Sequence, residues 1–315
     1  MENLLVNKVA AVKEVRQAVE YQKKKQACIL TGLAGSSKPV FFAAADKLLG
    51  GKGSMAFVTA SREEIRTYRR ELNYLYPDLP MQELYPVSLP RVQADTQSLE
   101  LQAGRAAALR FLSGEERGIV FITAEALQQK QLRPSGMSGK ALQLAVGEEH
   151  EQRNIAAALL DLGYERTEQV DALGQFCLRG DILDVYPINS SAAVRIEWFD
   201  NELDAMRSFD VDTQRSLQTL TSIKIAPLKV DESFSYDADI FEYCAADTMV
   251  VVDEPVHVFG MLEKLDKENK EHASELFGKQ ELIEQLAANG AVLVSALGHS
   301  YLQQLPSLNI PVRAV

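Results

Sequence analysis

Two periods of hydrophobic and polar positions organise the first 135 residues of the chain. Helical spacing of apolar side chains predicts helices at 3–22, 40–49, 61–75 and 95–113. Continuous apolar runs predict buried strands at 27–30, 55–59 and 118–123. Strands that alternate with helices in this way indicate a mainly parallel sheet covered on both faces, which is an α/β fold.

The pattern changes after a Pro/Ser/Gly stretch at 133–139, which we interpret as a domain boundary. From Ala141 onward, short alternating strands surround one helix at 151–162. This pattern of strands and one helix predicts a small α+β domain with an antiparallel sheet, inserted into the first domain. We therefore expect a first domain at 1–135 and an inserted domain at 136–225.

The remaining range, 226–315, is expected to form a third piece packed on the first domain. Its pattern predicts strands at 248–252 and 291–295 with a charged helix around 261–288 between them. The chain ends in strand-like sequence at 310–315, so we expect this piece to be truncated and the chain to be an excised fragment.

Composition and charge narrow the function classes. The chain has a formal charge of −11, from 44 acidic and 33 basic residues. Because clustered Lys and Arg supply most DNA affinity, strong non-specific DNA binding by this chain alone is disfavoured. Apolar runs are cut by charges before they reach membrane-spanning length, and the three cysteines lack CxxC spacing. We expect a cytoplasmic protein without a membrane partner.

The segment after the first strand resembles a phosphate-binding loop, GxxxxGK[ST], in altered form. Gly32 and Lys38 hold the expected places, and Gly35 lies between them. Ser37 replaces the second obligatory glycine, and its Cβ would occupy space that a phosphate needs. Pro39 replaces the residue whose hydroxyl should ligate magnesium. Lys38 could still attract a phosphate, but without the metal ligand we expect the loop to be a structural relic and not a working ATP site.

A second acidic motif ends the strand at 248–252. Asp253 and Glu254 stand where an ATPase holds magnesium and its attacking water, but Pro255 follows directly. Alone, the pair is as consistent with an ordinary strand end as with a site, and the altered loop weakens the catalytic interpretation. The four histidines are scattered and suggest no catalytic or metal-ligating cluster. We expect no cofactor, no metal and no catalytic residue in this chain.

Strand periodicity at 194–199 predicts a two-faced strand. Val194, Ile196 and Trp198 share the core face, whereas the other face carries the set Arg195, Glu197 and Phe199. The same alternation places Arg179 outward. An aromatic beside arginines favours a protein interface. The alternative is that the aromatic lies under a loop and the arginines form surface ion pairs, and the pattern alone leaves the two equal.

Three consecutive segments carry a resemblance to known proteins: FCLRGDILDVYP at 176–187, VRIEWFDNELD at 194–204 and SFDVDTQRSL at 208–217. With the altered loop, they resemble the first part of the excinuclease protein UvrB and, more closely, the N-terminal module of bacterial transcription-repair coupling factors. UvrB keeps a working phosphate loop, and the coupling factors lose it in this module. UvrB also inserts a DNA-clamping hairpin, for which the short stretch from 83–86 to 94–96 leaves no room.

The resemblance implies a non-catalytic docking module that mimics UvrB and recruits the excinuclease protein UvrA. In both families the small domain binds UvrA, and the contact residues correspond here to Arg179, Arg195 and Phe199. Weaker candidates from position alone are Asp181, Glu197 and Asp200. RNA polymerase and double-stranded DNA would be bound only by parts of the longer family proteins that are absent here. The alternative is an ATP-binding fragment of a UvrB-type or helicase-type ATPase.

Overall fold

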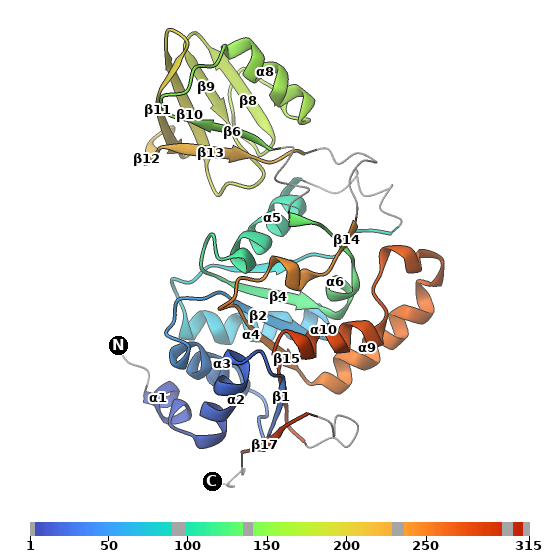
Figure 1. Ribbon diagram of the computed structural model, residues 1–315. Helices are drawn as coiled ribbons and strands as arrows, with labels where there is room; N and C mark the ends of the chain where they lie inside the picture. The colour runs from blue at the N-terminus through green and yellow to red at the C-terminus, as the bar shows by residue number, and fades with distance from the viewer. Residues whose placement is uncertain (1–3, 90–98, 135–140, 229–235, 298–304, 311–315) are drawn as a thin grey trace. The chain divides into compact units, whose positions relative to one another are not determined.

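The computed structural model describes residues 4–89, 99–134, 141–228, 236–297 and 305–310, and the chain divides into two compact units (Figure 1). Unit 1 comprises residues 1–91, 108–131 and 238–315, and unit 2 comprises 92–107 and 132–237. The boundary stretch expected at 133–139 lies mostly outside the described residues, as do the first residues of the helix expected at 95–113.

A seven-stranded sheet, with every neighbouring pair parallel, forms the centre of unit 1. Its strands, in spatial order, are β17 (Ser307–Asn309), β1 (Cys28–Thr31), β16 (Val292–Ser295), β15 (Met249–Asp253), β2 (Met55–Thr59), β4 (Ile119–Thr123) and β3 (Met81–Leu84). Three of these strands come from the range 226–315 and pair directly with β1 and β2. The sheet thus joins both ends of the chain.

Helices cover both faces of this sheet (Figure 1). One group packs against one face: α1 (Leu4–Ala10), α2 (Lys13–Lys23), α3 (Ser37–Leu48) and α4 (Arg62–Leu75). The other face is covered by the unit 1 part of α5 (Leu99–Ser113) and by α6 (Ala124–Gln128), α9 (Pro255–Glu268) and α10 (Lys279–Ala288). Two short helical turns, η2 (Ile240–Tyr243) and η3 (Lys270–Glu275), complete the described helices of this unit.

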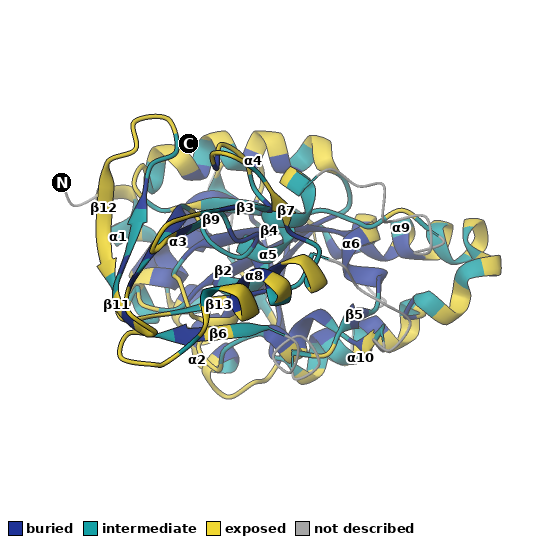
Figure 2. Cartoon of the chain, turned by 90° about the horizontal axis from the view of Figure 1, so that it is seen from above, coloured by how far each residue is buried: buried dark blue, intermediate teal, exposed yellow. Residues whose placement is uncertain are grey.

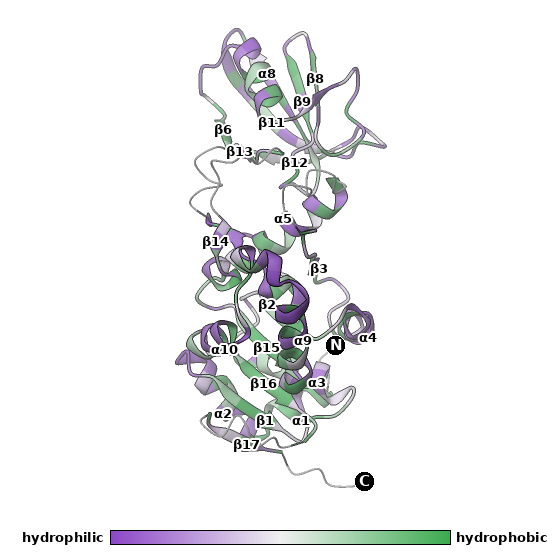
Figure 3. Cartoon of the chain, turned by 90° about the vertical axis from the view of Figure 1, so that its right-hand side faces the viewer, coloured by the Kyte–Doolittle hydropathy of each residue, from purple (hydrophilic) through white to green (hydrophobic). Residues whose placement is uncertain are grey.

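The five inner strands, β1, β16, β15, β2 and β4, are mostly apolar because both their faces are buried. In β2, Phe57 packs with the α3 and α4 side, whereas Ala56 and Val58 pack with the α9 and α10 side. Figure 2 shows β2 and β4 as buried, and Figure 3 shows β15 and β16 as hydrophobic. Burial on two faces is the reason that their sequences show runs and not alternation.

Unit 2 is built around a six-stranded sheet in the order β12-β11-β10-β9-β8-β7. The strands are β7 (Glu165–Arg166), β8 (Gln175–Arg179), β9 (Ile182–Val185), β10 (Ala193–Phe199), β11 (Glu202–Phe209) and β12 (Ser216–Leu220). All neighbours are antiparallel except β7 and β8. Two-stranded sheets pair β6 (Leu142–Ala145) with β13 (Ser222–Ile225), and β5 (Gln131–Leu132) with β14 (Tyr236–Ala238).

One face of the six-stranded sheet packs against α8 (Gln152–Asp161). The predicted inward set Val194, Ile196 and Trp198 is buried there with Phe176. The Trp198 indole donates to the carbonyl of His150 at 2.9 Å, so its polar atom is satisfied. The α/β architecture with a separate, mainly antiparallel sheet is therefore confirmed.

Two predicted helices are wrong in length. The helix expected at 3–22 is two helices, because the chain leaves the helical conformation at Val12, where φ is −65° and ψ is 132°. The helix expected around 261–288 breaks between α9 and α10, and Gly278 precedes the second part in extended conformation. Apolar periodicity continues across both breaks, so the pattern alone could not show them.

Candidate functional site

The altered phosphate loop lies between β1 and α3, at the carboxyl edge of the sheet. Gly32 has a φ of +89°, and a Cβ on it would lie 2.1 Å from the carbonyl oxygen of Ile310. Gly35 also has a positive φ, of +52°. The Ser37 hydroxyl donates back to the carbonyl of Ala34 at 2.7 Å, inside the loop. The tight turn of a phosphate loop is thus kept by glycine, while the serine hydroxyl serves the backbone.

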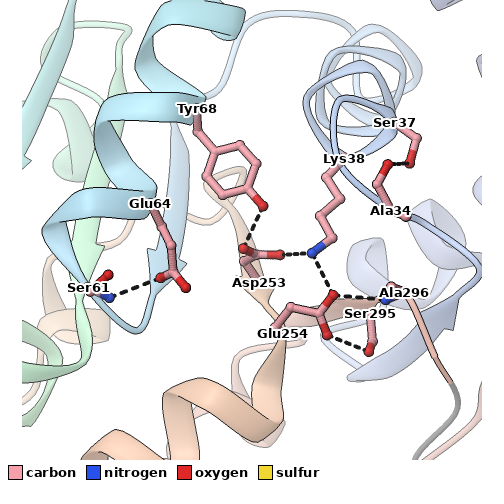
Figure 4. A network of polar contacts seen from close by, with 10 residues as sticks. All are labelled: Ala34, Ser37, Lys38, Ser61, Glu64, Tyr68, Asp253, Glu254, Ser295 and Ala296. Carbon is pink, nitrogen blue, oxygen red and sulfur yellow. Dashed lines mark hydrogen bonds and ion pairs between the residues drawn. The ribbon is translucent and has the colours of Figure 1, made fainter.

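Lys38 is buried and paired with the second acidic motif (Figure 4). Its side chain is 5% exposed, and its Nζ lies 2.6 Å from Asp253 Oδ1 and 2.7 Å from Glu254 Oε1. β1 and β15 are separated only by β16, so parallel strands bring the two motifs to one edge of the sheet. The three residues belong to the two altered motifs found in the sequence, and in the structure they form one network.

The two carboxylates have further donors. Tyr68 on α4 donates its hydroxyl to Asp253 Oδ2 at 2.7 Å. Glu254 accepts from the Ser295 hydroxyl at 2.7 Å and from the backbone N–H of Ala296 at 2.9 Å. Sequence reasoning missed Tyr68 and Ser295, because nothing in the local pattern links a helix or a neighbouring strand to this site.

The network has a defined charge state. Burial alone raises the pKa of Glu254, but hydrogen bonds from Lys38, Ala296 and Ser295 bring it below its ordinary value. Burial and the neighbouring Asp253 carboxylate raise the pKa of the Tyr68 phenol. The glutamate is therefore an anion and the tyrosine a neutral donor at neutral pH.

Glu254 also has an unusual backbone. Its φ is +38°, in the left-handed region, at the turn from β15 into α9. Such a conformation costs a non-glycine residue roughly 1–3 kcal/mol. Pro255 directly follows Glu254 and begins α9. Three hydrogen-bond donors to the Glu254 carboxylate hold Glu254 in this conformation.

This network can stabilise the fold. A phosphate would have to compete with the two carboxylates for the Lys38 ammonium. Two carboxylates already neutralise the Lys38 ammonium, and a third anion would meet their repulsion. Pro39, the third residue of α3, offers neither a hydroxyl for a metal nor an N–H for a phosphate. In the described part of the chain, no three His, Cys, Asp or Glu side chains are grouped to hold a metal ion.

A second candidate region is the side of the six-stranded sheet opposite α8, which we call the outer face. Strand register places Arg195 beside Asp184, and Asp184 beside Cys177 on the next strand. Glu197 and Ile182 are neighbours in the same register. This face carries charged residues beside a small buried apolar cluster that contains Cys177, Ala193 and Phe209, whereas the face under α8 is apolar.

Arg195 is held firmly on the outer face. Its Nε and Nη2 donate to the two carboxylate oxygens of Asp184 at 2.6 and 2.7 Å. Its guanidinium also lies 4.6 Å from the centre of the Phe209 ring, and Nη2 donates to Gln214 at 3.0 Å. The hydrogen bonds that Arg195 donates to Asp184 raise the pKa of its guanidinium further. An ion pair for this arginine was one of the two alternatives left open by the sequence.

Phe199 and Arg179 are the outward-reaching members. The Phe199 side chain is 77% exposed at the end of β10, so it does not lie under a loop. Arg179 is exposed at the end of β8, where its guanidinium donates to the carbonyl of Glu168. The same carbonyl accepts from the thiol of the buried Cys177 at 3.0 Å.

The weaker candidates are distributed around this face. Glu197 is paired with Arg207 on β11. Asp181, in the turn after β8, accepts a hydrogen bond from Gln152 at 3.2 Å. Asp200 lies in the turn after β10 with a φ of +59°. Of the three, Glu197 has the partner that most restricts its side chain.

Comparison with known proteins matches this second region to a protein-domain family. The sequence profile of the UvrB interaction domain matches residues 142–230. A transcription-repair-coupling factor of Bacillus subtilis (strain 168) is 36% identical over 203 residues, which are 64% of this chain and 17% of that protein. That of Escherichia coli (strain K12) is 28% identical over 165 residues, 52% of this chain and 14% of that protein. The resemblance to the coupling-factor module is confirmed.

A further relative extends the same result. The transcription-repair-coupling factor of Staphylococcus haemolyticus (strain JCSC1435) is 31% identical over 202 residues, 64% of this chain and 17% of that protein. The matched part is thus about a sixth of the length of these coupling factors. The match at 142–230 coincides with the sheet and helix of unit 2. No helix among the described residues of this coupling-factor-like chain is long and apolar enough to span a membrane.

Proposed function

We propose that this chain is a non-catalytic docking module that recruits the excinuclease protein UvrA in transcription-coupled repair, as a mimic of UvrB. The observation that carries the proposal is the coincidence of the UvrB interaction domain match with the outer face. Arg179 and Phe199 are presented there to solvent by the ends of β8 and β10. Arginine and aromatic side chains that lie exposed together are typical anchors of protein interfaces.

The charge network of unit 1 supports the non-catalytic part of the proposal. The Lys38 ammonium is neutralised inside the protein, and Pro39 removes the metal-binding hydroxyl. Mg-ATP should therefore not raise the melting temperature of this chain, whereas any ligand that binds only the folded state must raise it. A saturable rise would instead support the alternative, an ATP-binding fragment.

Calorimetric titration of the chain with purified UvrA tests the docking role. We expect Arg179→Glu and Phe199→Ala each to weaken binding by about tenfold or more, because interface anchors of these types contribute about 2 kcal/mol. Arg153→Glu on the exposed side of α8 is the matched control and should leave binding unchanged. Undiminished affinity in both outer-face variants would remove this face from the interface.

Arg195 is a less clean probe than the sequence suggests. Its side chain is only 20% exposed and that of Asp184 14%, so Arg195→Glu would also place two carboxylates together. We expect this variant to lose both UvrA binding and folding stability. Comparison with Arg195→Glu/Asp184→Arg, which restores the opposite charges, separates the two effects: recovered melting temperature without recovered binding assigns the arginine to the interface.

A further inference from the structure

A groove on unit 1 carries positive charge on this otherwise acidic chain. It has a volume of about 650 Å³ and lies between α4 and the segment 77–81 that follows it. Arg66, Arg69 and Arg70 line its helical side. Asp78 is the acidic residue among the lining side chains. The lining is therefore cationic, by three charges to one.

Helix geometry explains why these arginines share one side. Positions 66, 69, 70 and 73 follow the i, i+3, i+4, i+7 spacing of one helical face. Tyr68 and Leu72, by contrast, are buried against the sheet. The groove is thus bordered by the solvent-facing flank of α4, and the helix presents its arginines in a fixed row.

The three arginines differ in how they are held. Arg69 is anchored, because its Nη1 donates to the carbonyl of Met81 at 3.2 Å and its guanidinium lies 5.3 Å from the centre of the Phe121 ring. Arg66 and Arg70 are exposed, and neither makes an ion pair or hydrogen bond with any other part of the chain that the structure describes. Two guanidinium groups remain available although acidic residues exceed basic ones by 44 to 33.

The opposite side of the groove is apolar. Pro77, Leu79, Pro80 and Met81 line it. Guanidinium groups pair with carboxylates in a planar, two-bonded geometry, and prolines with aliphatic side chains form a surface for apolar groups. The groove therefore combines two requirements: carboxylates along α4 and an apolar side chain against 77–81.

We propose that this groove binds an acidic segment of a partner protein, in which an apolar residue is flanked by aspartate or glutamate. The described lining contains no aromatic ring on which a nucleic-acid base could stack. The net charge of −11 also opposes a long polyanion more than a short acidic peptide. The groove belongs to unit 1, and the proposal stands independently of UvrA docking.

Fluorescence anisotropy with a rhodamine-labelled peptide Glu-Glu-Leu-Leu-Glu-Glu tests the proposal, at an ionic strength of about 0.02 M, where screening is weak. Saturable binding is expected, with about tenfold weaker affinity in Arg66→Glu/Arg70→Glu. The control Lys13→Glu/Lys24→Glu makes the same charge change at exposed positions at the two ends of α2 in unit 1 and should change affinity by less than about twofold. Circular dichroism verifies that each variant is folded.

Further probes separate the two requirements. Leu79→Asp should lower the affinity for the acidic peptide several-fold, because it places a charge on the apolar side of the groove. A Gln-Gln-Leu-Leu-Gln-Gln peptide should bind far more weakly than the acidic one. The proposal is overturned by absent binding, by equal loss in the lysine control, or by equal affinity for the glutamine peptide. Tighter binding of a rhodamine-labelled oligothymidylate, lost in the arginine variant, would overturn it in favour of a nucleic-acid site.

Discussion

The substitution Lys38→Met tests whether the altered phosphate loop now serves the stability of unit 1. The change keeps an unbranched side chain of similar length and removes only the ammonium. Asp253, whose side chain is 3% exposed, would then keep Tyr68 as a donor and lose its cation. Glu254, at 18% exposed, would keep Ser295 and Ala296.

The expected cost follows from burial. Removing one member of a buried ion pair typically costs about 3–5 kcal/mol, because a charge is left uncompensated. The remaining Tyr68 bond and the partial exposure of Glu254 place our expectation at the lower end, about 3 kcal/mol. For a denaturant slope of about 2 kcal/mol/M in urea, the midpoint of unfolding should fall by roughly 1.5 M.

The single tryptophan makes the assay specific to a unit. Trp198 is the only tryptophan of the chain and lies in β10 of unit 2. Helical circular dichroism reports mainly unit 1, to which α1–α4, α9 and α10 belong. We expect Lys38→Met to lower the midpoint seen by circular dichroism more than the one seen by fluorescence.

The matched control is Lys52→Met, which removes an exposed lysine of the same unit and should change the free energy of unfolding by less than about 0.5 kcal/mol. An equally small effect for Lys38→Met would refute the reasoning, since it would show that the ammonium is not desolvated in solution.

Three further outcomes are expected. The pKa of Glu254 is lowered in the folded state. The wild type should therefore be more stable than Glu254→Gln by a full margin well above about pH 4.3, and this margin should shrink as the pH falls below that value. A constant margin between pH 7 and 3 would contradict this. Gly32→Ala should destabilise unit 1 by more than about 1 kcal/mol, measured by circular dichroism, since its φ of +89° and the nearby Ile310 carbonyl leave no room for a Cβ. Tyr164→Phe should cost about 1–2 kcal/mol in the Trp198 fluorescence transition alone, because the phenol donates to Ala226 and accepts from the Ile188 N–H; an equal shift of unit 1 would show that the units unfold together.

Local pattern predicted the parts of the fold that depend on local forces. The strand at 55–59 is β2 residue for residue, because both its faces are buried. The helix predicted from residue 61 is α4, and a capping box opens it, with the backbone N–H of Ser61 donating to Glu64 at 3.0 Å. Alternation in β10 correctly separated Trp198, in the core, from the exposed Phe199.

Partners distant in sequence were beyond the pattern. Tyr68 and Asp253 are 185 residues apart, and only the order of strands brings α4 over the end of β15. The Asp184 partner of Arg195 depends on the register of β9 with β10, which follows from the turn between them and from core packing. The sequence therefore identified the charged groups. Which of them have an ion-pair or hydrogen-bond partner within the protein was decided by the tertiary structure.

That difference in pairing separates the two candidate regions in physical terms. In unit 1 the charged residues of the two altered motifs are inside the protein, where Lys38 and its two carboxylates satisfy one another. A ligand there must first break contacts that the fold itself uses. In unit 2, Phe199 and Arg179 are displayed at strand ends, and a partner that covers them displaces mainly water. Burial of the exposed aromatic is favourable by itself, so binding energy is available at the outer face and opposed at the loop.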